Sequence, residues 1–263
     1  MSYTVTRREF ADALAGHILY LLKLANGAQL NLSGRTIPAR SIPARAQCLR
    51  RANFACCHAP GVDLSARDLS YSTLSGADFS GASLCCANLA HVAAEYVNFT
   101  ESKLTSAIFR RAIINGAKFH AAAAPHADFS AACAFNADFS GAQLHSADFR
   151  SANLRAADFS DISGADLWLS ESDLTRANMR RAFLSHANLT QANADAVDMR
   201  CASLHGACLR DASLRGADLR GADLSYADLR GANLEGAEIA AADFTGARLD
   251  DDTLDDCITD EHS

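Results

Sequence analysis

Cysteine and histidine are the residues of this sequence best suited to metal binding or nucleophilic chemistry. The chain holds 9 of each. Two adjacent pairs stand out, Cys56-Cys57 and Cys85-Cys86, but neighbouring cysteines rarely bridge each other because the geometry is strained. No Cys or His follows the spacing of a tetrahedral metal site. We therefore predict no bound metal, and free thiols in a reducing compartment.

The sequence shows no catalytic constellation. No nucleophile lies at a recognisable spacing from a general base, and there is no glycine-rich phosphate loop. His126 and His145 are expected to lie close together in the fold derived below, but two imidazoles alone do not form a site. We therefore predict that the protein binds no cofactor and is not an enzyme.

A five-residue repeat predicts the elements that position these side chains. Residues 212–236 repeat an Ala, a polar residue and a Leu in nearly every block of five. On a helix each repeat would rotate the apolar residue by about 140°, so no stripe would form. On a flat strand successive Leu residues would alternate faces. The period is consistent with a chain that turns a corner once per repeat and keeps every central residue inside a solenoid.

Phenylalanine spacing indicates how many repeats complete one coil. Central positions fall at every residue number ending in 4 or 9 from Leu49 to Leu254. The Phe residues at these positions recur at intervals of twenty, which is four repeats. We therefore predict a four-sided coil with two internal aromatic columns. The predicted core Phe residues are Phe79, Phe99, Phe119, Phe139 and Phe159 in one column, and Phe109, Phe129 and Phe149 in the other.

The A(D/N)LxG pattern resembles that of the pentapeptide-repeat family, over roughly Cys48 to Leu254. The resemblance implies an all-β solenoid, a right-handed four-sided β-helix, here of about ten coils. It says less about function, because one fold can host several unrelated roles.

The N-terminal residues differ from the repeats. Thr6 followed by Glu9 is a capping-box signal, and apolar residues then recur at helical spacing. We predict a helix from about Arg7 to Ala25, stopped near Gly27, that covers the open end of the solenoid. The chain then divides into residues 1–29, a capping helix; 30–254, the β-helix; and 255–263, an acidic tail. A twin-arginine export signal is the alternative for the N-terminus.

One irregularity interrupts the early repeats. Ile37 and Ile42 already step by five, but the next central residue, Leu49, follows after seven. The two extra residues predict a bulge or small loop between Ile42 and Leu49.

Charge separates the repeats from the tail. The formal net charge is −7, and the 24 Lys and Arg balance the acids that lie outside residues 250–263. One side of the solenoid is expected to carry a column of acids. Its members are Asp78, Asp138, Asp158, Asp198, Asp218 and Glu238. Family members that mimic DNA and inhibit type II topoisomerases use such columns, but Arg180, Arg200 and Arg220 interleave with this one. We therefore expect Asp and Asn here to bind corner backbone instead.

Apolar residues that the repeat directs outward indicate a surface for a protein partner. The predicted partner surface comprises Tyr96, Ile108, Ile113, Phe135, Trp168 and Phe183. An alternative register through Ala165-Asp166-Leu167 would instead turn Trp168 inward. No nucleic-acid partner is expected, because the arginines lie among acids.

These features favour a non-catalytic scaffold with an unidentified protein partner. The run Ser83–Leu89 is similar to stretches in secreted pentapeptide-repeat effectors of Gram-negative bacteria, which would make the protein a host-directed adaptor. The alternative is a DNA-mimic inhibitor or protector of a type II topoisomerase. We expect a cytoplasmic protein, or one secreted into a host cell if it is an effector. No stretch approaches the roughly 20 apolar residues of a transmembrane helix.

Overall fold

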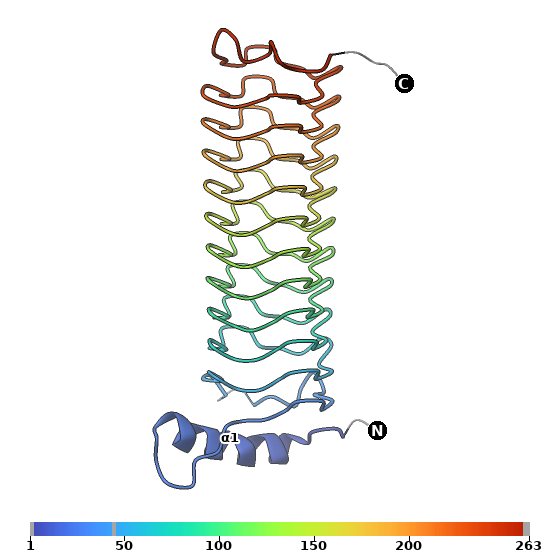
Figure 1. Cartoon of the computed structure of the whole chain (residues 1–263). Coiled ribbons are helices and arrows are strands. Elements are labelled where there is room, and N and C mark those ends of the chain that lie inside the picture. The colour runs from blue at the N-terminus through green and yellow to red at the C-terminus, as the bar shows by residue number, and fades with distance from the viewer. Residues whose placement is uncertain (1–2, 44–45, 260–263) are drawn as a thin grey trace.

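A computed structural model describes residues 3–43 and 46–259 of the chain. It contains one helix, α1 (Arg7–Leu21), followed by a solenoid that rises coil upon coil (Figure 1). Within the described residues the coils are joined by single parallel bridges and not by longer strands. Each step of the chain is therefore too short to form an ordinary strand, as a corner in every repeat requires.

The bridges show the register directly. From the pair Cys48 and Asp68 to the pair Asp228 and Arg248, every bridge joins residues twenty apart. In the first coil the spacing is 22, as in the bridge between Thr36 and His58. Two residues are therefore inserted in that coil only. This confirms the predicted bulge between Ile42 and Leu49, part of which, residues 44–45, lies outside the described residues.

A left-handed residue forms each corner of the coil. In the regular repeats φ is positive at residue numbers ending in 1 or 6, as at Gly141 (66°), Ala131 (54°) and Arg111 (55°). The corner N–H donates to the next coil, as Arg111 does to the carbonyl of Ser130 (3.0 Å). Glycine adopts this conformation without steric cost, whereas other residues are strained by roughly 1–2 kcal/mol each. Many corners of this chain lack glycine, so their strain must be offset by the bonds between coils.

The interior is filled by the central residues and by the small residues two places before them. All eight predicted core Phe side chains are buried. Along one column Phe119 stacks on Phe139, with ring centroids 4.7 Å apart and planes 5° apart. Between columns Phe119 meets Phe129 edge to face at 5.6 Å. Both are favourable arrangements of aromatic pairs, so the two columns form one continuous aromatic core.

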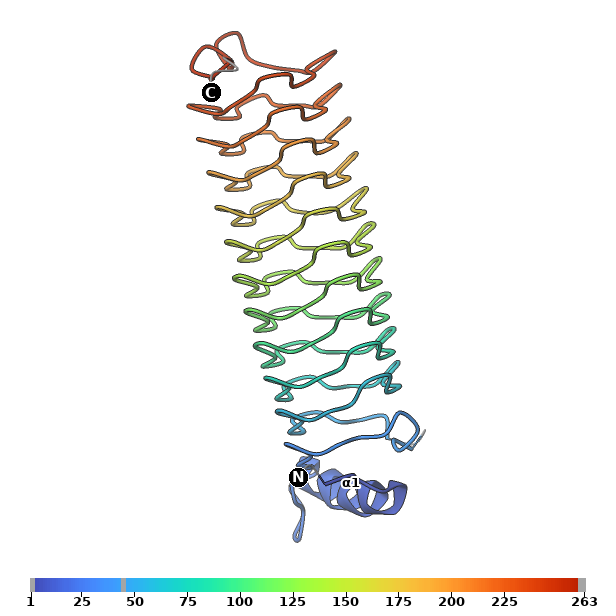
Figure 2. The same cartoon turned by 90° about the vertical axis from the view of Figure 1, so that its right-hand side faces the viewer.

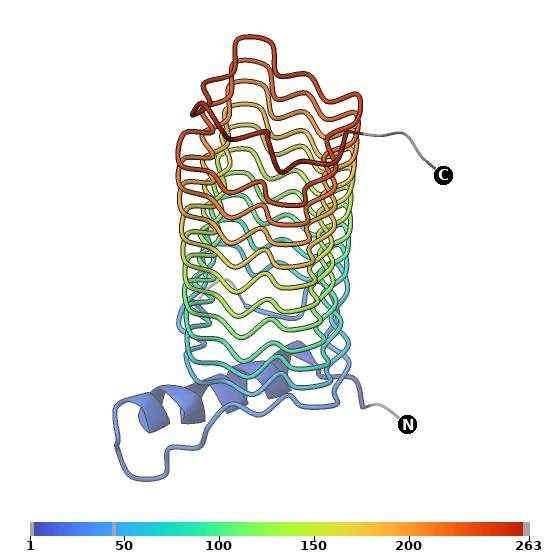
Figure 3. The ribbon, with the colours of Figure 1, turned by 45° about the horizontal axis from the view of Figure 1, so that its top comes forward.

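Helix α1 lies across the N-terminal end of the solenoid (Figures 2 and 3). Thr6 and Glu9 form the predicted capping box, and Phe10 and Leu14 are buried. His17, which the sequence analysis did not single out, is also buried, and its Nδ1 accepts the Leu30 N–H (3.0 Å).

The end of α1 differs from the prediction. The helix stops at Leu21 and not near Ala25, because Lys23 adopts a positive φ of 56°. Gly27 is required for a different reason from the one expected. A Cβ at this position would lie 2.3 Å from the backbone nitrogen of Tyr20. Gly27 therefore lets the returning chain approach the helix closely, while Lys23 turns it.

The C-terminal residues pack against the last coil as far as they are described. Ile258 forms a bridge with Glu238, and the Asp256 carbonyl accepts the Gly236 N–H (3.0 Å). The central residues here, including Phe244 and Leu249, are only half-buried. The end of the solenoid is thus less tightly covered than its middle.

Truncation of an inward Phe should destabilise the rod strongly. We expect Phe119→Ala to lower the free energy of unfolding by about 3–5 kcal/mol, because it opens a cavity among stacked rings. Phe183→Ala is the matched control, since Phe183 is 49% exposed and surface truncations usually change stability by about 0.5 kcal/mol or less. Urea denaturation of both variants measures the difference, and equal losses would contradict an inward column.

Adjacent alanines allow a test of the corner strain. We expect Ala131→Gly to raise the free energy of unfolding by up to about 1 kcal/mol, because it relieves a left-handed alanine. Ala132→Gly should lower it by about 1 kcal/mol, because Ala132 is buried and not at a corner. Thermal unfolding of the two variants should therefore shift in opposite directions. Destabilisation of similar size in both would show that the corners are not strained.

Candidate functional site

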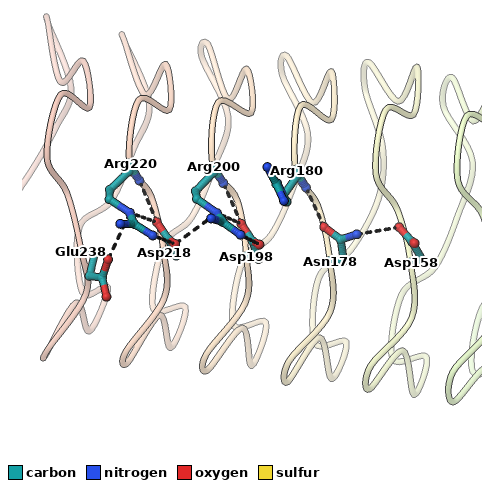
Figure 4. Close-up of polar contacts among 8 residues, drawn as sticks. All are labelled: Asp158, Asn178, Arg180, Asp198, Arg200, Asp218, Arg220 and Glu238. Atoms are coloured by element: carbon teal, nitrogen blue, oxygen red, sulfur yellow. Dashed lines mark hydrogen bonds and ion pairs between the residues drawn. The ribbon is translucent and has the colours of Figure 1, made fainter. Parts of the chain in front are cut away.

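The outer surface carries the polar side chains in rows, because equivalent positions stack every twenty residues. One row forms an ion-pair ladder, which we define as Asp158, Asn178, Asp198, Arg200, Asp218, Arg220 and Glu238 (Figure 4). Asn178 Nδ2 donates to Asp158 Oδ1 (3.0 Å). Further along, Arg200 Nε lies 3.2 Å from Asp218 Oδ2. The row therefore links coils through side chains as well as through backbone.

Each Asp of the ladder also accepts a backbone N–H at its own turn. Asp198 Oδ1 accepts both the backbone N–H of Arg200 (3.2 Å) and its Nε–H (2.8 Å). Asp218 holds Arg220 in the same way, with distances of 3.2 Å and 2.9 Å. This confirms that Asp and Asn in this row bind corner backbone, as is typical of these residues in turns.

Arginines compensate part of the charge of the ladder, whose four acids face two guanidinium groups. Arg220 Nε lies 3.1 Å from Glu238 Oε2, so this arginine joins two acids. Burial acts to raise the pKa of Asp198, but the hydrogen bonds and charge of Arg200 outweigh it, and the net effect lowers this pKa. A surface that mimics DNA must present uncompensated negative charge along its length. The pairing observed here interrupts such charge, because Arg200 and Arg220 each contact two acids.

The two adjacent cysteine pairs differ in burial. Cys57 is buried, which raises the pKa of its thiol to about 12. Cys56 and Cys86 are exposed at corners, and Cys85 is half-buried. A buried thiol with so high a pKa is a poor nucleophile at neutral pH.

The described histidines are not grouped as metal ligands. His126 and His145 are neighbours on successive coils, where the N–H of His126 donates to the carbonyl of His145 (2.9 Å). The ring of His145 instead pairs with Ser163, 3.0 Å from Nε2 to Oγ. Within residues 3–43 and 46–259, no group of three or more His, Cys, Asp or Glu residues could hold a metal ion.

The six predicted partner residues are exposed, but they lie on different sides. Their exposed fractions run from 37% for Ile108 to 73% for Tyr96. Ile108 and Trp168 occupy one side, three coils apart, and the Arg150 guanidinium lies 5.6 Å from the centroid of the Trp168 ring. Phe183 occupies another side, between Ser163 and Ser203. These three residues therefore do not form one patch.

The other predicted partner residues lie closer together. Ile113 lies on the side next to that of Ile108, and Tyr96 and Phe135 lie at the corner that ends this side. Tyr71, which the sequence analysis missed, is 47% exposed at the opposite corner of the same side. The repeat could have revealed it, because residue numbers ending in 1 mark corners, where a large ring must point outward.

A model of pentapeptide repeats matches this chain in eight copies. The matched residues include 48–84, 86–120, 126–161, 160–193, 169–200, 184–216 and 212–251. The chain belongs to the pentapeptide repeat family. The solenoid of this pentapeptide repeat protein is accordingly a right-handed β-helix. No curated protein matches the sequence significantly.

Solved structures of pentapeptide repeat proteins resemble the chain. One is HetL of the cyanobacterium Nostoc sp. strain PCC 7120, which is involved in the regulation of heterocyst differentiation. HetL is 29% identical to this chain, and the match covers 94% of this chain and 96% of HetL with a TM-score of 0.36. QnrB1, a plasmid-mediated fluoroquinolone resistance protein, is 20% identical over 78% of this chain and 87% of its own, with a TM-score of 0.31.

A third resembling structure covers less of the chain. A pentapeptide repeat protein of the Arabidopsis thaliana thylakoid lumen is 34% identical over 32% of this chain and 60% of its own, with a TM-score of 0.28. TM-scores this low carry no implication for the function of the present protein. In the part of this pentapeptide repeat protein that the structure describes, no helix has the length and apolarity needed to cross a membrane.

Low pH should lower the free energy of unfolding of the rod, because its paired carboxylates lose their charge. The hydrogen bond from Arg230 lowers the pKa of Asp228 from 3.8 to about 2. Because this pKa is lowered in the folded state, its stabilisation is complete above the unfolded value and is lost as the pH falls toward 2. We expect the urea midpoint to drop below about pH 4. Asp228→Asn should reduce this drop, and an unchanged pH profile in that variant would contradict the assignment.

Proposed function

We propose that this protein is a non-catalytic scaffold, a four-sided rod of about ten coils that presents its outer surface to a protein partner. The observation that carries this proposal is the filled interior. Inward residues throughout the regular coils, from Leu49 to Leu229, are almost all fully buried and apolar. Side chains therefore occupy the space in which a ligand pocket would have to form, and recognition falls to the outside.

The effector-like run supports an adaptor role. Residues 83–89 belong to the regular coils, with Leu84 and Leu89 buried and Cys86 exposed. We propose that the rod holds a partner in a fixed position, as a long rigid solenoid can. Its place of action is the bacterial cytoplasm or, for a secreted effector, the host cell.

The rival function is that of a DNA mimic directed at a type II topoisomerase. Such a role requires a continuous negative side, like the charge that duplex DNA presents along its axis. The ladder argues against it, because Arg200 and Arg220 each contact two acids. The remaining negative charge is concentrated in residues 250–263 and does not extend along the rod.

A supercoiling assay with DNA gyrase separates the two functions. We expect the full chain to leave supercoiling unchanged even in large molar excess, because its acids are paired with arginine. The matched variant Arg200→Gln/Arg220→Gln unmasks the acids of one side and controls for the effect of added negative charge. Inhibition by the wild-type protein at substoichiometric or equal concentration would replace the scaffold with the DNA mimic.

A further inference from the structure

We propose that one side of the rod docks an acidic amphipathic helix of the partner protein. The docking face is defined by Tyr71, His91, Tyr96, Arg111, Ile113 and Phe135. The proposal rests on the scaffold function above and names the surface and the chemistry of its partner.

The middle of this side is uncharged over six coils. Its bridge positions are Asn53, Thr73, Ala93, Ile113, Cys133 and Asn153. The first acid in this row is Asp173. Over the same coils each of the other three sides carries charge at its bridge positions, as at Lys103, Asp128 and Lys118. A partner that covers this side therefore does not need to desolvate a charge at the centre of the contact.

Aromatic side chains at both edges of this face are held in place. The ring of Tyr71 stacks on that of His91, with centroids 4.7 Å and planes 5° apart. A Cβ at Gly116 would lie 2.7 Å from the ring of Tyr96, so Gly116 leaves space for that ring to lie along the next coil. Because these rings are already ordered, a partner loses less entropy when it binds them.

Ile113 lies between those edges, and Phe135 extends the apolar surface along the edge of Tyr96. Phe135 is 50% exposed, and its backbone N–H donates to Asn115 Oδ1 (3.0 Å) on the coil below. Ile113 is 41% exposed at the centre of the face. Neighbouring exposed apolar residues of this kind mark a binding surface more strongly than scattered ones.

Charge at the edges favours an acidic partner. Arg51 and Arg111 lie at the corner that bounds one edge, and within the described residues neither forms an ion pair. Their neighbours Arg50 and Arg110 are instead engaged by acids of the adjoining side. On the opposite edge Glu95 accepts a hydrogen bond from Ser75. Carboxylates along one flank of the partner would complement the two unpaired guanidinium groups.

The backbone of this face offers no free strand edge, which favours a helix in the partner. Each coil between Tyr71 and Phe135 is bonded to the coils above and below it, so no free strand edge is available for β-augmentation. The partner must satisfy its own backbone hydrogen bonds, as a helix does. With coils stacked about 4.8 Å apart, the face is roughly 15 Å long, which matches a helix of about 10–12 residues.

Peptide selection against the full-length chain tests the proposal. A displayed library of random peptides of about 16 residues, long enough for the predicted helix, is panned on the wild-type protein. We expect enriched peptides with apolar residues at helical spacing and Asp or Glu on one flank. The synthetic peptides should bind Ile113→Asp and Phe135→Asp at least about tenfold more weakly. Arg111→Glu should also weaken binding, as should added salt.

Phe183→Asp is the matched control, because Phe183 is 49% exposed on another side and should retain full affinity. Thermal unfolding checks that all variants stay folded. The docking face is overturned if the peptides bind the Ile113→Asp and Phe135→Asp variants as tightly as wild type, or if they are basic. The scaffold function would then remain, with binding on another side of the rod. Absence of any enriched peptide overturns the docking face, and gyrase inhibition would overturn the scaffold itself.

Sedimentation of the free protein tests the competing occupant. We expect the wild-type protein to show no dimer that is lost in the Phe135→Asp variant. A dimer lost in that variant would assign the face to a second copy of this chain and overturn the acidic helix.

Discussion

A left-handed residue at every fifth position is the constraint on which this fold depends. Each such corner is strained when it is not glycine, as at Arg111 and Ala131. The strain is offset only when the next coil supplies a carbonyl to the corner N–H, as Ser130 does for Arg111. A single coil is therefore unstable alone, and the solenoid gains stability as neighbouring coils stack.

The interior follows from the corners, because a fixed coil length leaves a core of nearly constant width. Large and small residues must then compensate for each other within a layer. At Gly164 an added Cβ would lie 3.1 Å from Ile162 Cδ1 and 3.5 Å from Leu167 Cδ2. These enlarged neighbours occupy the space that the missing side chain leaves. Such filling of the regular coils leaves the outer side chains as the ones that another molecule can contact.

Stacking also organises the surface, since residues twenty apart become neighbours. One side uses this arrangement for stability, where Arg200 forms ion pairs with Asp198 of its own coil and Asp218 of the next. Another side, centred on Ile113, is uncharged at its bridge positions from Asn53 to Asn153 and has ordered rings at its edges. The same repeat therefore produces one face whose charged side chains pair with each other and another whose apolar side chains stay exposed. The two faces differ in the residues that precede each central position.

The sequence alone determined which residues point inward, the twenty-residue register and the extra residues before Leu49, because all three depend on counting along the chain. It did not determine where α1 ends, because Lys23 and not Gly27 adopts the left-handed turn. Nor did it show that Tyr71 lies on the same side as Ile113 while Phe183 does not. Lateral contacts between residues far apart in sequence depend on the side to which each belongs and on where its side chain lies. Only the stacked tertiary structure decides both, because they arise from packing between coils and not within a repeat.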